Sequence, residues 1–167
     1  MSRCLGFDPG ASKGCAWALY DSDTDALEVG TLRVEGEDLP AYFGLAVALI
    51  QEKRADTVGV ETQYAPRLPV VETLRLSKEA LMGRLYATAA AALKLAYIRG
   101  LLVGAALVCE CAVAEVHPTT VKAAITGTGR ASKDQVKRAV EALYGKRLGE
   151  DRADAAAVAI AAPRRAS

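Results

Sequence analysis

The chain has 167 residues, of which 51% are hydrophobic and 25% are charged, and its formal net charge is +1 at pH 7. This length and composition suit one globular domain with a sizeable core and exclude a disordered chain. A net charge near zero gives no bulk attraction for nucleic acid, so any such function must rest on local features.

The first third of the chain predicts three strands joined by tight turns. Apolar or alternating runs cover 4–7, 15–20 and 27–34, with turn-forming residues between them. This order is typical of an antiparallel meander. A helix is expected next over 39–53, where apolar residues recur at helical spacing, followed by a short buried strand over 58–61.

A loop and a long helix dominate the middle of the chain. Two prolines make 63–70 a loop. A helical region over 73–107 follows, with a bend near Gly100 or Gly104, and a final strand is expected at 112–116.

Three shorter helices complete the prediction. Thr119 or Thr120 would cap the first of them. Ser132 would cap the second, with Gln135 three residues later as in a capping box. The expected helices cover 119–125, 133–144 and 151–162. The order of elements predicts an α/β fold with an antiparallel edge on a partly parallel sheet.

The Ala- and Leu-rich stretch 81–113 has the composition of a membrane helix. Arg84, Lys94, Arg99 and Glu110 interrupt it, so no uncharged span of about 20 residues remains. A buried helix, with no membrane association, is the preferred interpretation.

Cysteine and histidine do not predict a metal site. The four cysteines lack zinc-finger spacing: Cys4, Cys15, Cys109 and Cys111. Without a signal peptide, reduced and buried thiols in a cytoplasmic protein are expected. The single histidine, His117, is interpreted as a turn residue before Pro118.

Four carboxylates stand at positions that favour chemistry. Asp8 and Glu61 each end a predicted strand, whereas Asp151 and Asp154 lie three residues apart in the first turn of the last helix. The rest of that helix is almost wholly apolar, so its acidic start must be held against the sheet. Such acids either cap helices or jointly bind hard cations. Capping explains Asp151 alone, but four acids together favour a hard-cation site, and two such ions can activate water and stabilise the leaving oxygen of a phosphodiester.

Positive charge gathers after these acids in the sequence. Residues 122–147 contain seven basic and two acidic side chains, whereas residues 1–61 contain five basic and eleven acidic ones. This division permits a basic surface beside an acidic site, although the same lysines could simply solvate helix faces.

Several short segments, in the same order along nearly the whole chain, resemble one family. They are Gly6–Gly10, Val60–Tyr64, Leu93–Leu95, Arg99-Gly100, Val121-Lys122, Ile125–Gly127, Lys133–Val136 and Asp151–Ala155. In them the chain resembles the RuvC family of Holliday junction resolvases. The resemblance implies an α/β, RNase H-like fold with a central five-stranded mixed sheet flanked by helices. By this resemblance the chain would form one nuclease domain over 1–162, followed by a short basic tail at 163–167.

The resemblance also implies an activity and a cofactor. Asp8, Glu61, Asp151 and Asp154 would be catalytic and would bind two Mg²⁺ ions, for which Mn²⁺ would substitute. The expected enzyme is a structure-selective endodeoxyribonuclease. It would resolve Holliday junctions by paired symmetric nicks that leave 5′-phosphate ends. Other branched DNA could also be a substrate.

Five further residues are implied to bind DNA. Lys122 and Lys133 match family lysines that contact phosphate near the scissile strand, and Arg130 and Lys137 are candidates on the same basis. Tyr64 matches an aromatic residue that stacks near the strand exchange point. The plainer interpretations are lysines that solvate helix starts and a core tyrosine at a strand end.

A four-way junction has two-fold symmetry, so paired cuts imply a C2 homodimer. The helix over 81–107 could supply the interface or could be ordinary core. The segment 65–92 is longer than in the usual bacterial resolvase, so the family's helicase docking and narrow sequence preference are not carried over.

The competing hypotheses are an RNA-processing nuclease of the YqgF type and a catalytically silent junction-binding protein. An actin-like phosphotransferase needs two such domains, for which 167 residues leave no room.

Overall fold

The protein is built around one mixed sheet. The computed structural model describes residues 3–9, 14–34, 38, 40–62 and 77–163. Within these ranges the strands follow the order β3-β2-β1-β4-β5. The three N-terminal strands are antiparallel neighbours, and β4 and β5 run parallel to β1. The strands are β1 (Arg3–Pro9), β2 (Cys15–Asp21), β3 (Ala26–Leu32), β4 (Thr57–Glu61) and β5 (Ala112–Val116). The predicted five-stranded mixed sheet is confirmed, with β3 ending two residues earlier than expected.

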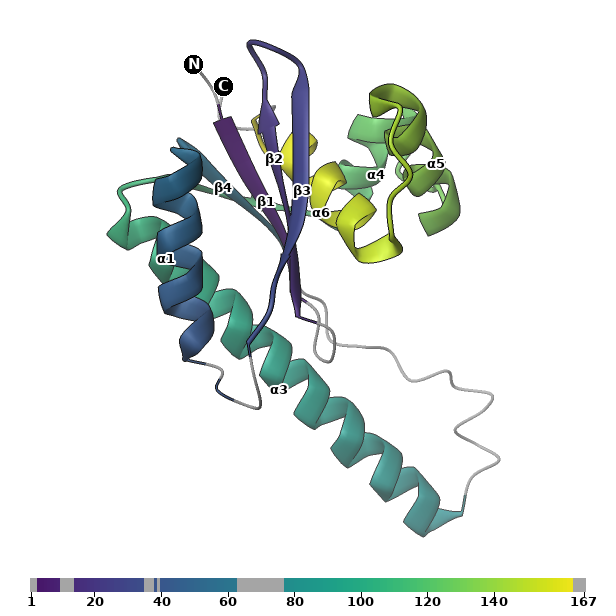
Figure 1. Ribbon diagram of the computed structural model, residues 1–167. Coiled ribbons are helices and arrows are strands. Elements are labelled where there is room, and N and C mark those ends of the chain that lie inside the picture. The colour runs from purple at the N-terminus through teal and green to yellow at the C-terminus, as the bar shows by residue number, and fades with distance from the viewer. Residues whose placement is uncertain (1–2, 10–13, 35–37, 39, 63–76, 164–167) are drawn as a thin grey trace.

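Helices cover both faces of the sheet (Figure 1). They are α1 (Ala41–Lys53), α3 (Lys78–Val108), α4 (Pro118–Thr126), α5 (Lys133–Tyr144) and α6 (Glu150–Ala161). Alternate residues of β1 belong to two separate cores, because successive side chains of a strand point to opposite faces. Leu5 and Phe7 pack in the core beneath α1 and α3, whereas Cys4 packs in the core that α6 covers.

Helix α6 lies unusually close to the sheet. A Cβ atom on Gly6 of β1 would overlap the backbone of Ala155 and Ala159 in α6. A Cβ atom on Gly59 of β4 would lie 2.9 Å from the Cβ of Ala162. The buried side of α6 consists mostly of alanine, so small residues on both partners let the helix backbone approach the strands. This close contact fixes where the acidic start of α6 is held.

The long helix α3 departs from the prediction of a buried helix. It begins after Ser77, whose side chain accepts a hydrogen bond from the backbone N–H of Ala80, and it continues through Gly100 and Gly104 without interruption. Its fully buried side chains all belong to the second half: Ile98, Leu102, Ala105 and Ala106. The first half projects beyond the sheet (Figure 1).

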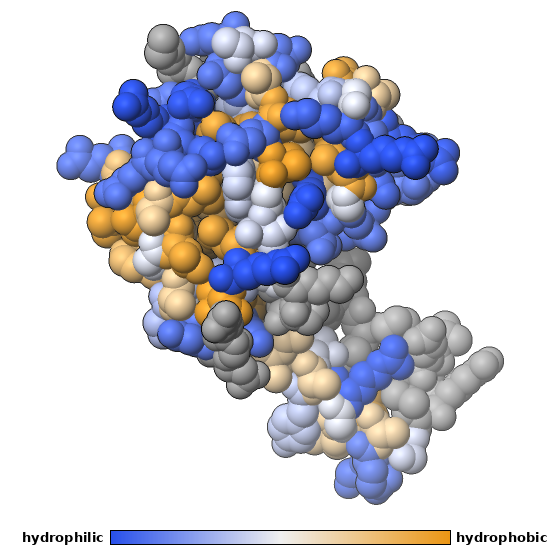
Figure 2. Space-filling view, viewed as in Figure 1, coloured by the Kyte–Doolittle hydropathy of each residue, from blue (hydrophilic) through white to orange (hydrophobic). Residues whose placement is uncertain are grey.

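Length explains the projection of α3. A helix of 31 residues is about 46 Å long, whereas strands of 5 to 7 residues span about 17 to 23 Å. The sheet therefore cannot cover the whole helix. By length and composition α3 could also cross a membrane, and only 22% of its most apolar window is buried. Figure 2 shows weakly hydrophobic surface mixed with hydrophilic surface on the projecting end.

The remaining predictions differ in their outcomes. His117, rather than Thr119 or Thr120, caps α4: its Nδ1 accepts a hydrogen bond from the Thr119 backbone N–H at 3.1 Å. Proline at the first helical position, where its fixed φ suits the helix, moves the start one residue earlier than expected. The capping box of Ser132 and Gln135 is confirmed.

All four cysteines are free thiols, and all except Cys109 are buried. The predicted loop at 63–70 and the end of the basic tail lie outside the described residues.

Candidate active site

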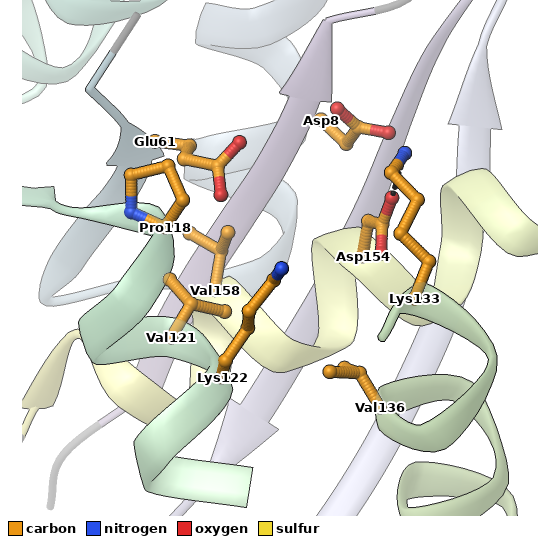
Figure 3. A pocket seen from close by; sticks show the side chains of 9 residues that line it. All are labelled: Asp8, Glu61, Pro118, Val121, Lys122, Lys133, Val136, Asp154 and Val158. Atoms are coloured by element: carbon orange, nitrogen blue, oxygen red, sulfur yellow. Dashed lines mark hydrogen bonds and ion pairs between the residues drawn. The ribbon is translucent and has the colours of Figure 1, made fainter. Parts of the chain in front are cut away.

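Three of the four predicted carboxylates line one cavity of about 210 Å³. Asp8 comes from the end of β1, and Glu61 is the last residue of β4. The parallel pairing of β1 with β4 includes Phe7 opposite Val60, so the next residues, Asp8 and Glu61, lie side by side at the carboxyl ends of the two strands. Asp154 joins them from α6, which packs on β1. Figure 3 shows the three side chains around the same opening.

Two lysines enter this cavity from the opposite wall. Lys122 comes from α4 and Lys133 from the first position of α5 (Figure 3). Lys133 Nζ donates a hydrogen bond to Asp154 Oδ2 at 3.0 Å and lies 3.4 Å from Glu150 Oε1. Sequence reasoning missed Glu150, although an acid directly before Asp151 at the helix start was a usable signal. The apolar lining of the cavity is Pro118, Val121, Val136 and Val158.

Negative charge at the site is only partly compensated. The pKa of Asp8 is raised to about 7, first by burial and then by the charges of Asp154, Asp151 and Glu61, while Lys133 lowers it. The pKa of Glu61 is also raised, first by burial and then by Asp154, while Lys133 and Lys122 lower it. The raised pKa values of Asp8 and Glu61 mean that their ionised forms are destabilised, and a bound cation would offset that cost.

Asp151 stands apart from the other three acids. Its side chain is exposed and lines a neighbouring cavity of about 220 Å³ together with Arg33 and Arg152. Its charge nevertheless acts on Asp8 and raises the pKa of that carboxyl. The sequence spacing therefore placed Asp151 near the site, but the structure divides the four acids into a cavity group of three and one outer member.

The residues of the site fit a hard divalent cation. Carboxylate oxygens are the ligands that Mg²⁺ prefers, and Asp8 is partly desolvated. Among the described residues, no three acidic, histidine or cysteine side chains already surround one point as a ligand set. One carboxylate oxygen of Asp154 instead accepts a hydrogen bond from Lys133. The assignment of the four acids as metal ligands stays a prediction.

The other predicted DNA-binding residues lie at increasing distance from the cavity. Lys137, one turn after Lys133, lines an adjacent cavity of about 260 Å³ that also includes Glu150. Arg130 is exposed in the connection between α4 and α5. Tyr64 lies outside the described residues, so its predicted stacking role stays a prediction.

Comparisons with known proteins match nearly the whole chain to one family. A family model described as "Crossover junction endodeoxyribonuclease RuvC" matches residues 4–162. A protein of that name from Halorhodospira halophila is 34% identical over 169 residues, with 96% of this chain and 89% of the relative covered. Another, from Gluconacetobacter diazotrophicus, is 35% identical over 165 residues, with the same shares covered.

Two solved structures have the same fold. Thermus thermophilus RuvC superposes with a TM-score of 0.66 at 20% identity, with 95% of this chain and 92% of that chain covered. T. thermophilus RuvC in complex with a Holliday junction substrate gives a TM-score of 0.69 at 21% identity, with 96% and 92% covered. The expected RNase H-like fold is therefore confirmed.

Proposed function

The chain belongs to the RuvC family of crossover junction endodeoxyribonucleases, and from this premise we propose that it is a Mg²⁺-dependent endonuclease that resolves four-way DNA junctions. One observation supports the proposal most: three carboxylates from β1, β4 and α6 meet two lysines in one open cavity. Carboxylates suit hard cations and lysines suit phosphate, so the two sets together suit phosphodiester hydrolysis.

The residues divide the work by their chemistry. Asp8, Glu61 and Asp154, with Asp151 completing the set, would hold two Mg²⁺ ions, which when bound activate water and stabilise the leaving 3′ oxygen. Lys122 faces the same opening and would hold the phosphate by its charge. The expected product is a nick with a 5′ phosphate and a 3′ hydroxyl.

Cleavage of a synthetic four-way junction tests the proposal. With Mg²⁺ or Mn²⁺, the protein is expected to cut opposite strands symmetrically, and ligation of the nicked products would establish the 5′ phosphate. Asp8→Asn is expected to lower the cleavage rate at least about 100-fold, which corresponds to about 2.7 kcal/mol in the barrier.

The competing functions give different outcomes in the same assay. Cleavage of structured RNA with an intact junction would identify an RNA-processing nuclease and contradict the proposal. Junction binding without cleavage by the unaltered protein would identify a silent binding protein. Flaps and forks, assayed in parallel, would show whether other branched DNA is cut.

Paired cuts also require two active sites on one junction. We propose that the protein acts as a C2 homodimer, because a two-fold symmetric substrate is matched by a two-fold symmetric enzyme. The projecting half of α3 supports this proposal, since it leaves Tyr86 and Leu93 with 70% and 72% of their surfaces exposed.

A further inference from the structure

Lys133 has an unusual place for a residue expected to bind DNA. It is the first residue of α5, directly after Ser132, and the capping box of Ser132 and Gln135 fixes where the helix begins. From this position its side chain extends toward Asp8 and Asp154 (Figure 3). The helix cap therefore fixes the backbone position of Lys133, while its ammonium lies beside the acids.

The contacts of Lys133 are those of a counter-ion. Its ammonium lies 3.0 Å from Asp154 and 3.4 Å from Glu150. It also opposes the increase in pKa that burial and the neighbouring acids cause at Asp8 and Glu61. Lys122, by comparison, lines the same cavity but makes no ion pair of 4.0 Å or less in the described part of the chain.

A lysine and a divalent cation compete for the same acid. Asp154 Oδ2, which accepts the hydrogen bond from Lys133, is one of the oxygens that the proposed metal site needs. Two cations close to one carboxylate repel each other, and the repulsion is strong where burial lowers the effective dielectric constant. The Lys133 side chain is 66% exposed, so its flexible stem has room to turn toward solvent.

We propose that Lys133 is a tethered counter-ion of the metal-free site, which a divalent cation must displace before the site can act. The inference rests on the proposed function, because it takes Asp154 as a metal ligand. Displacement has a second consequence: the released ammonium stands at the mouth of the cavity, where a DNA phosphate would approach. Metal loading and phosphate capture are then coupled through one side chain, while Lys122 is available to phosphate throughout.

Binding of Mn²⁺ to the full chain without DNA tests the inference, with free Mn²⁺ measured by electron paramagnetic resonance. Lys133→Met removes the competing charge but keeps an unbranched stem, so Mn²⁺ should bind about three- to tenfold more tightly. Lys133→Gln should show the same change and serves if the first variant folds poorly. Lys137→Met removes an equal charge one helical turn away, outside the cavity that Asp8, Glu61 and Asp154 line, and should change Mn²⁺ affinity much less.

Two results would overturn the inference. If the Lys133 variants bind Mn²⁺ with unchanged or weaker affinity than the unaltered protein, Lys133 is not a competitor. If Lys137→Met tightens binding equally, only net charge matters. Both outcomes leave the proposed function intact, because that function fails on a different result, an uncut junction in the presence of Mg²⁺.

Discussion

At the scale of single residues, Asp8 shows how function and stability oppose each other. Its carboxyl is half-buried beside other carboxylates, and its pKa of about 7 lies far above the ordinary 3.8. A raised carboxyl pKa means that the folded protein binds the proton more tightly than the unfolded chain does. The stabilisation from that proton is complete below about pH 4 and is lost as the pH rises through about 7.

This titration predicts that Asp8→Asn stabilises the metal-free protein at about pH 8, because the amide keeps the shape of the carboxyl without its charge. The gain should be at least about 1 kcal/mol, since one pKa unit corresponds to about 1.4 kcal/mol. It should shrink toward about pH 5, where the native carboxyl is protonated. Thermal unfolding in a chelator at several pH values measures the difference.

Addition of Mg²⁺ provides the control for this prediction. The unaltered protein should gain stability from the ion, because a ligand that binds only the folded state stabilises it. Asp8→Asn should gain much less. A variant that is less stable than the unaltered protein in the chelator at about pH 8 would show that the Asp8 charge is already compensated.

At the scale of secondary-structure elements, the contact between α6 and the sheet positions the site. The helix rests on Gly6 and Gly59, and Asp154 faces Asp8 because no side chain separates the two backbones. The metal-binding geometry thus depends on residues that carry no functional group. Gly6 lies two positions before Asp8, in the part of β1 that α6 covers.

Gly6→Ala is therefore expected to displace α6 and lower stability by about 1 to 3 kcal/mol, as overpacking of a tight core does. The rate of junction cleavage should fall by more than the loss of stability explains, since Asp154 would move away from Asp8.

Gly44→Ala is the matched control, because a Cβ atom on this exposed residue of α1 meets nothing within 4 Å. It should stabilise the helix by up to about 1 kcal/mol. Equal effects of the two variants in denaturant unfolding would contradict this account of α6.

Sequence patterns predicted the elements well because local rules determine them. Periodicity and capping residues located all five strands and the described helices, and strand ends located Asp8 and Glu61. The ion pair between Lys133 and Asp154 was not predictable, because it joins residues 21 positions apart on different helices. The outer position of Asp151 was also missed: a spacing of three indicates a shared helix side, but not which cavity each side chain enters.

At the scale of the whole molecule, the first half of α3 is the least explained surface. Exposed Met82, Tyr86, Leu93 and Tyr97 follow one another at intervals of four, seven and four residues, so they share one side of the helix. The second half of the same helix contributes Ile98, Leu102, Ala105 and Ala106 to the core. The interpretation of this helix as core is therefore correct for part of its second half. Its interpretation as a dimer interface stays a prediction, for which the exposed half is the natural candidate.

A homodimer through this surface predicts a specific response to charge. Tyr86→Glu combined with Leu93→Glu would place four like charges in a two-fold interface, so the protein should become monomeric in sedimentation experiments. Each monomer retains the whole carboxylate cavity, which is built from other elements. The monomer should therefore still nick a junction, but the two cuts should lose their simultaneity. Leu143→Glu alters a side chain that is 63% exposed on α5 and should leave the dimer intact. If the unaltered protein sediments as a monomer and still makes paired cuts, symmetry must come from the junction rather than from α3.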